Sequence, residues 1–161
     1  MLDLRSLATQ RDYLPNNQVI AVTIDGDKFT WGDIQQRIDL LQIKLNVVSE
    51  PNIALFHTDA VEFLIGLLAV WRLGKTAVVP ANTLDSMIDA VSLKSSIFLG
   101  ELAASSSSQA TITQTTHACA QSPALIIFTS GSTGTPTAVS KSFDQLSAEL
   151  EMIEYHWGNI V

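Results

Sequence analysis

The stretch Ala124-Leu-Ile-Ile-Phe-Thr-Ser-Gly-Ser-Thr-Gly-Thr-Pro-Thr137 decides the fold of this chain of 161 residues. Its first part, Ala124 to Phe128, is wholly apolar, which predicts a buried strand. Its second part, Thr129 to Thr137, is rich in glycine and hydroxyl side chains, and a helix is predicted shortly after it. A loop that follows a strand of a parallel sheet lies at the edge where α/β proteins bind ligands.

The composition of this loop predicts a phosphate-binding site. Gly131 and Gly134 permit backbone conformations that other residues avoid, and they let a ligand approach the backbone closely. Successive backbone N–H groups, supplemented by hydroxyl groups, form a nest for phosphate oxygens. The candidate cofactor-binding residues are Thr129, Ser130, Gly131, Ser132, Thr133 and Gly134, with Lys141 as a further candidate.

Two well-known phosphate loops do not fit. A Walker A loop requires lysine after its second glycine, but Pro136 and Thr137 occupy the corresponding places. A dinucleotide fingerprint, G-x-G-x-x-G, requires a glycine where Thr133 stands. The sequence also has no G-x-S-x-G motif, so it lacks the nucleophile signature of a hydrolase.

The loop does resemble the signature of adenylate-forming enzymes, the superfamily of acyl-CoA synthetases, peptide-synthetase adenylation domains and luciferases. Their pattern reads roughly T-S-G-[ST]-T-G-x-P-K after an apolar strand, and residues 129–134 and Pro136 match it in register. Upstream, Phe29-Thr-Trp-Gly-Asp-Ile34 and the segment 67–81 resemble two further family segments in the required order. The resemblance therefore covers nearly the whole chain and implies the first part of the large N-terminal domain.

What the resemblance implies is an ATP-dependent ligase that converts an acyl or aryl carboxylic acid to an acyl-adenylate and passes it to CoA or an acyl carrier protein. ATP and magnesium would be the cofactors, and the loop would hold the pyrophosphate end of ATP. Family members place the adenine, acid and magnesium sites and a catalytic lysine in later motifs. We therefore expect an N-terminal fragment of a longer enzyme that has no catalytic or metal-binding residues of its own and is inactive alone.

The chain departs from the family pattern at one position. Thr137 stands where the family usually has a lysine that would help to neutralise the β- and γ-phosphates. Lys141 is the candidate substitute, although an extended segment would place it about 13 Å along the chain from Thr137. This departure leaves open two alternatives, a non-catalytic stand-alone interaction module that keeps the fold, and a generic phosphate-binding protein.

Composition excludes several other classes. The net charge of −7 argues against a nucleic-acid partner. The apolar run 63–71 is shorter than the roughly 20 residues that span a bilayer, and the N-terminus lacks the apolar core of a signal peptide, so we expect a cytoplasmic protein without a membrane span. Cys119 is the only cysteine and has no metal-binding spacing. Charged residues make up only 16% of the chain, which indicates either that part of its surface is covered or that it is an α/β domain whose parallel strands are buried on both faces.

Alternating strands and helices predict an α/β fold, a three-layer, largely parallel sheet with helices on both faces, preceded by a β-hairpin. We expect one domain, residues 1–161, with a flexible Ser/Thr-rich loop at 101–122. A surface strand built on Thr111-Ile112-Thr113 is the alternative for part of this segment. Trp31, Trp71 and Trp157 fall in helical apolar stripes and are predicted to be buried, and His57 is predicted to be structural. The expected hairpin covers 19–30, the strands cover 53–56, 76–79, 96–99 and 124–128, and the helices cover 31–45, 60–73, 84–92 and 143–157.

Overall fold

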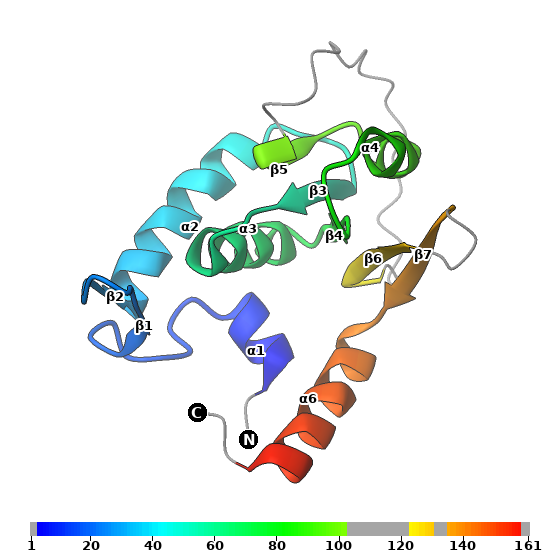
Figure 1. The fold of residues 1–161 in the computed structure, drawn as a ribbon. Coiled ribbons are helices and arrows are strands. Elements are labelled where there is room, and N and C mark those ends of the chain that lie inside the picture. Colours follow the sequence, from blue (N-terminus) through cyan, green and yellow to red (C-terminus); the bar gives the residue numbers. More distant parts are fainter. Residues whose placement is uncertain (1–2, 103–122, 131–134, 159–161) are drawn as a thin grey trace.

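The computed structural model describes residues 3–102, 123–130 and 135–158. Its strands are β1 (Val19–Val22), β2 (Lys28–Thr30), β3 (Asn52–Phe56), β4 (Thr76–Val79), β5 (Phe98–Gly100), β6 (Leu125–Ser130) and β7 (Pro136–Lys141). Within these residues, β1 and β2 form an antiparallel hairpin, and the others form one sheet in the order β5-β3-β4-β6-β7 (Figure 1). Strands β5, β3, β4 and β6 run parallel to one another, whereas β7, at the edge, runs antiparallel to β6.

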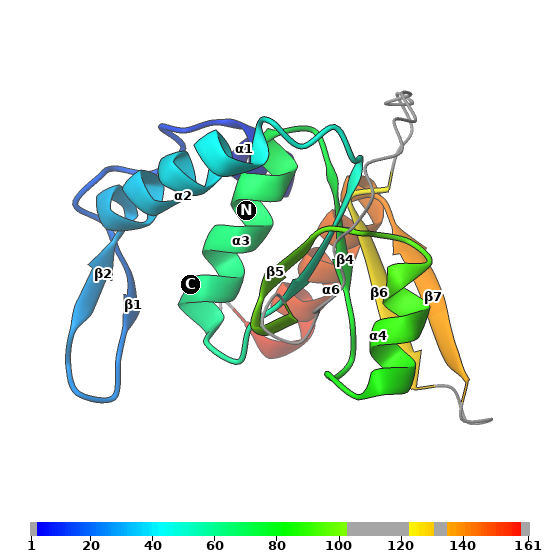
Figure 2. The ribbon, with the colours of Figure 1, turned by 90° about the horizontal axis from the view of Figure 1, so that it is seen from above.

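Helices cover both faces of the sheet. The helices are α1 (Leu4–Thr9), α2 (Trp31–Leu45), α3 (Ala60–Arg72), α4 (Asp85–Ser92) and α6 (Phe143–Trp157). Figure 2 shows α3 and α4 on opposite sides of the strands, with α2 stacked outside α3 and the β1–β2 hairpin projecting away from the sheet. The predicted three-layer, largely parallel α/β fold with an N-terminal hairpin is therefore confirmed.

Local signals explain where α2 and α3 begin and where α3 ends. The Thr30 hydroxyl accepts from the Asp33 N–H, and the Asp33 carboxylate accepts from the Thr30 N–H, so a capping box starts α2. The Asp59 carboxylate accepts the first free N–H groups of α3. Gly74, with φ of +68°, ends α3 in a left-handed conformation that favours glycine.

The core has two parts, one on each face of the sheet. On the first face, α3 packs between the sheet and α2, and its contacts include Leu68 and Trp71. The Trp71 indole N–H donates to the Ala124 carbonyl at 2.7 Å, and its ring meets the Phe143 ring edge-on at 5.0 Å. On the second face, Met87 and Val91 of α4 pack against buried residues of β3, β4 and β6. The two parts together hold β6, the strand that leads to the predicted loop, in the interior of the sheet.

Some predictions differ from the structure. Strand β7 was not predicted, because four of its six residues, 137–140, are exposed and show no apolar alternation. Trp31 and Trp71 are buried as predicted, but Trp157 is 82% exposed, so its predicted burial is wrong. Most of the loop expected at 101–122 lies outside the described residues, although Glu101 and Leu102 are helical and Leu102 is buried.

Candidate functional site

The frame of the predicted site is the carboxyl end of β6. Residues 131–134, which include Gly131, Ser132, Thr133 and Gly134, lie outside the described residues. The residues that enter and leave this segment are described. Thr129 is exposed at the end of β6, and its hydroxyl donates to the Thr137 carbonyl at 3.4 Å. Ser130 pairs with Pro136 across the strands.

This register makes the loop the connection of a β-hairpin. The sequence predicted that a helix would follow shortly after the loop, but the whole of β7 intervenes before α6 begins at Phe143. Because β7 runs back along β6, the N-terminus of α6 lies at the opposite end of β6 from the loop. The positive end of the α6 dipole therefore points away from the site, and a phosphate in the loop would depend on loop N–H and hydroxyl groups.

Lys141 is held away from the loop by the same register. It pairs with Leu125 at the start of β6, about 17 Å along β7 from Pro136 at roughly 3.4 Å per residue. Its ammonium group forms an ion pair with Glu149 of α6. The structure thus brings Thr129, Ser130 and Pro136 together at one end of the hairpin and does not bring Lys141 to them.

Thr137, rather than Lys141, lies beside the ends of the loop. It lies opposite Thr129 in the strand pairing and is exposed. The sequence from 123 to 140 contains no lysine or arginine. Residues 123–140 therefore offer hydroxyl and backbone N–H groups, but no positive side chain, to an anion.

A polar cluster that sequence reasoning missed lies at the same edge of the sheet, where β3 and β5 end. The Glu101 carboxylate accepts from both the Thr58 hydroxyl, at 2.6 Å, and the Thr58 N–H, at 2.8 Å. These hydrogen bonds lower the pKa of Glu101, the hydroxyl bond contributing most. Gly100 has φ of +75°, and a Cβ there would lie 2.2 Å from the Phe56 carbonyl oxygen and 2.5 Å from the His57 ring. The His57 ring is thus packed against the backbone at Gly100.

Only the position of these residues at strand ends could have indicated this cluster. Thr58 and Glu101 are 43 residues apart in the chain, so no short motif joins them. Two strand spacings, about 10 Å, separate β3 from β6 across the sheet. The cluster therefore borders the edge that carries the loop without forming part of the loop.

In the described parts of the chain, no three His, Cys, Asp or Glu side chains are grouped so that they could hold a metal ion. Within the same residues, no helix combines the length and apolar character needed to cross a bilayer.

No protein-family model matches the sequence, and no curated protein matches it. Among solved structures, o-succinylbenzoate CoA synthetase from Bacillus subtilis, in complex with the acyl-adenylate intermediate, is similar with a TM-score of 0.67 and 17% identity. The match covers 98% of this chain and 47% of the synthetase chain. The same synthetase is also known in complex with ATP and a magnesium ion.

Two other solved structures are similar. ATP-bound MatB from Rhodopseudomonas palustris has a TM-score of 0.58 and 20% identity, over 96% of this chain and 37% of MatB. The N-terminal subdomain of Klebsiella oxytoca NpsA, in complex with 3-hydroxyanthranilyl-AMSN, has a TM-score of 0.55 and 21% identity, over 88% of this chain and 40% of the subdomain chain. The chain therefore has the fold of the N-terminal part of adenylate-forming enzymes, and it spans less than half the length of these proteins.

Proposed function

We propose that this chain is the N-terminal part of an ATP-dependent ligase that activates a carboxylic acid, and that its loop binds the phosphates of ATP. The observation that carries the proposal is the loop 129–134, which begins at the carboxyl end of β6 in a fold shared with adenylate-forming enzymes. The acid would be acyl or aryl, and the acyl-adenylate would pass to the thiol of CoA or of a carrier protein. The chain spans less than half the length of the similar enzymes, so the other groups that this activity requires would come from further residues.

In such a ligase, a carboxylate oxygen attacks the α-phosphorus of ATP, the bond to the β-phosphate oxygen breaks, and pyrophosphate leaves. Catalysis depends mainly on positioning and on neutralising charge. Thr129, Ser130, Ser132 and Thr133 would donate hydroxyl hydrogen bonds to the pyrophosphate end of ATP. Gly131 and Gly134 would let backbone N–H groups approach the same oxygens.

The described part of the chain does not supply the positive charge that this reaction needs beside the phosphates. The segment around the loop has no cation, because Thr137 replaces the expected lysine and Lys141 is paired with Glu149. Magnesium would arrive bound to the phosphates of ATP, since no metal-binding group occurs among the described residues. We therefore expect the isolated chain to bind ATP weakly and to catalyse no ATP–pyrophosphate exchange.

Calorimetric titration of the chain with Mg-ATP tests the loop directly. Gly131→Val should abolish binding, because a branched side chain would block close approach of phosphate to the backbone. Ser140→Val is the control, since Ser140 is exposed on β7, pairs with Ile126 away from the loop, and has no positive φ that would strain a branched side chain. Thermal unfolding of each variant would show that both remain folded. Binding by Gly131→Val as strong as that of the unmodified chain would contradict the proposal.

Two lysine variants separate the roles of positions 137 and 141. Thr137→Lys should strengthen Mg-ATP binding about tenfold or more, because it places a cation opposite Thr129 beside the loop. Lys141→Met should leave binding unchanged, because Lys141 lies at the far end of the hairpin. A loss of binding in Lys141→Met would show that this lysine reaches the phosphates, as the sequence alone suggested.

The stand-alone interaction module is the second candidate function, and Thr137 in the place of a lysine is the observation that favours it. Under this reading the chain keeps the fold without nucleotide. The absence of Mg-ATP binding in both the unmodified chain and Thr137→Lys would favour the module.

A further inference from the structure

A short helix near the N-terminus is the main neighbour of α6. Helix α1 lies between α3 and α6 (Figure 1), and among the described helices and strands it is the one that α6 contacts most. No residue of α6 is itself buried within the described part of the chain. Its inner side chains, Phe143, Leu146 and Leu150, are only partly buried where they pack on the core. The position of α6 therefore depends on what α1 and this inner face supply.

Buried side chains fix α1 to α3. Leu4 is almost fully buried and Ala8 is fully buried, and both belong to the core that α3 shares. The Asp3 carboxylate caps α1 by accepting from the N–H groups of Arg5 and Ser6. A helix of six residues is not stable by itself in water. Helix α1 therefore forms only while Leu4 and Ala8 remain packed on the core.

Arg5 links α1 to the first turn of α6. Its guanidinium forms an ion pair with Asp144 at 3.1 Å and lies over the Phe143 ring, 5.4 Å from the ring centroid. The same ring meets the Trp71 ring of α3 edge-on. An exposed ion pair contributes little by itself, but the stem and the guanidinium of Arg5 also cover the aromatic ring. Helices α1, α3 and α6 thus meet at Phe143.

The segment that follows α1 is attached to α2. The Arg11 guanidinium bonds to the Asp39 carboxylate at 2.6 Å, and the Arg11 carbonyl accepts from the Trp31 indole N–H at 3.2 Å. Residues 3–11, which we call the strap, therefore run from α6 across α3 to α2. An arginine side chain holds each end of the strap to a carboxylate on another helix.

We propose that the strap is a conformational latch for α6. While α1 is packed, the strap holds α6 against α3; when α1 opens, α6 is released with it, and α2, α3, α4 and the sheet stay folded. Elements with few buried apolar contacts open at a lower free energy than the core does. Helix α6, which has no buried residue among the described ones, is such an element, whereas α3 has six.

The latch reaches the hairpin that carries the candidate loop. Glu149 of α6 pairs with Lys141, the last residue of β7. Release of α6 would separate this pair and leave β7 held by its pairing with β6 and its contact with α4. The latch itself is a property of the fold and does not depend on ATP binding at the loop.

Native-state hydrogen exchange tests the latch. Leu4→Ala removes a buried side chain from α1 and should speed exchange of the α1 and α6 amides by the same factor, about tenfold or more, without affecting α3. Met87→Ala, at a buried position of α4 in the second part of the core, is the matched control and should leave exchange in α6 unchanged. Faster exchange in α1 alone, or equal acceleration in α1, α6 and α3, would overturn the proposal.

A milder variant tests the link without removing buried apolar area, and it keeps the test available if Leu4→Ala does not fold. Arg5→Met should speed exchange in the first turns of α6 about threefold, and this effect should shrink at high salt. Arg37→Met, which removes the ion pair between Arg37 of α2 and Glu62 of α3, should leave α6 unchanged. Circular dichroism would show that both variants are folded. No acceleration of α6 exchange in Arg5→Met, or an equal acceleration in Arg37→Met, would also overturn the proposal.

Discussion

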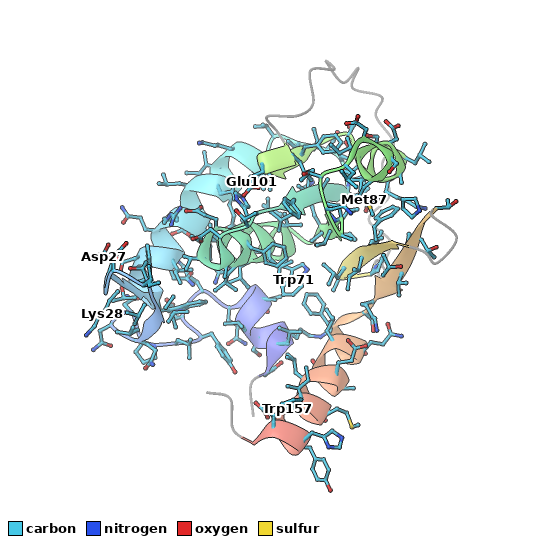
Figure 3. The ribbon with its side chains drawn as sticks, viewed as in Figure 1. Asp27, Lys28, Trp71, Met87, Glu101 and Trp157 are labelled. Carbon is cyan, nitrogen blue, oxygen red and sulfur yellow. The ribbon has the colours of Figure 1, made fainter. Side chains whose placement is uncertain are left out.

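Helices α3 and α6 show what an apolar helix needs in order to become core. The sequence predicts an apolar stripe on both. In α3 the buried residues include Ile65, Leu68 and Val70, whereas α6 contains no buried residue among the described ones. Figure 3 shows the contrast in two tryptophans, Trp71 among the packed elements and Trp157 at the outer end of α6.

The difference follows from where each helix lies. Helix α3 connects β3 to β4 in the interior of the sheet, so it packs on β3, β4 and β5 and is flanked by α1 and α2. Helix α6 follows β7, the edge strand, and it contacts α1 and packs on the core through Phe143, Leu146 and Leu150, with the Phe143 ring against Trp71. Apolar composition makes burial favourable, but the topology must supply the neighbour that provides it.

The largest predicted effect separates the two helices directly. Leu68→Ala should lower the free energy of unfolding by about 2–5 kcal/mol, because it opens a cavity at a fully buried position. Met152→Ala should change it by less than about 0.5 kcal/mol, because the side chain is exposed. Urea unfolding followed by circular dichroism measures both changes. Similar losses in the two variants would show that α6 is as well covered as α3.

A smaller effect is predicted for the helix caps. Asp59→Ala removes the acceptor for the first N–H groups of α3 and should cost about 1 kcal/mol of global stability. Ser142→Ala removes the matching acceptor of α6, and it should mainly speed amide hydrogen exchange in the first turn of α6. Native-state hydrogen exchange distinguishes the two responses. A global loss in Ser142→Ala equal to that in Asp59→Ala would mean that α6 unfolds only with the rest of the chain.

The smallest effect concerns pH and contrasts two capping boxes. In α2, the box uses Asp33, whose pKa is lowered by the Thr30 hydroxyl and then by the Thr30 N–H. In α6, the box uses the uncharged Gln145. A carboxylate with a lowered pKa stabilises the folded state above the ordinary value of 3.8, and this contribution is lost as the pH falls through the lower value.

Urea unfolding across the acid range measures this contrast. The stability difference between the unmodified chain and Asp33→Asn should shrink as the pH falls from about 6 to below 3.8. The corresponding difference for Gln145→Ala should stay constant over that range. A constant difference for Asp33→Asn would show that its charge contributes nothing to the cap.

Much of the fold could be predicted because its signals are local. The capping residues Thr30, Asp59 and Ser142 each precede a periodic apolar run, and each caps a helix in the structure. The apolar run before Thr129 is a buried interior strand, as predicted. The candidate loop was found in the same way, from nine consecutive residues that required no knowledge of distant contacts.

The parts that could not be predicted depend on pairing between segments. Strand β7 has exposed residues and is held by its backbone pairing with β6, so its side chains carry no pattern that reveals it. The same pairing decides that Lys141 lies beside Leu125 and Thr137 beside Thr129. The contact between Thr58 and Glu101 likewise exists only because β3 and β5 are neighbours in the sheet.

The sequence by itself determined the α/β class, the helix boundaries and the candidate loop, because periodicity, caps and glycine placement act over a few residues. Only the tertiary structure decided which apolar stripe is covered and which end of the β6–β7 hairpin carries Lys141. It also decided that Thr58 and Glu101 meet at the edge of the sheet where the loop begins. These features depend on strand order and register, which are set by packing among segments far apart in the chain.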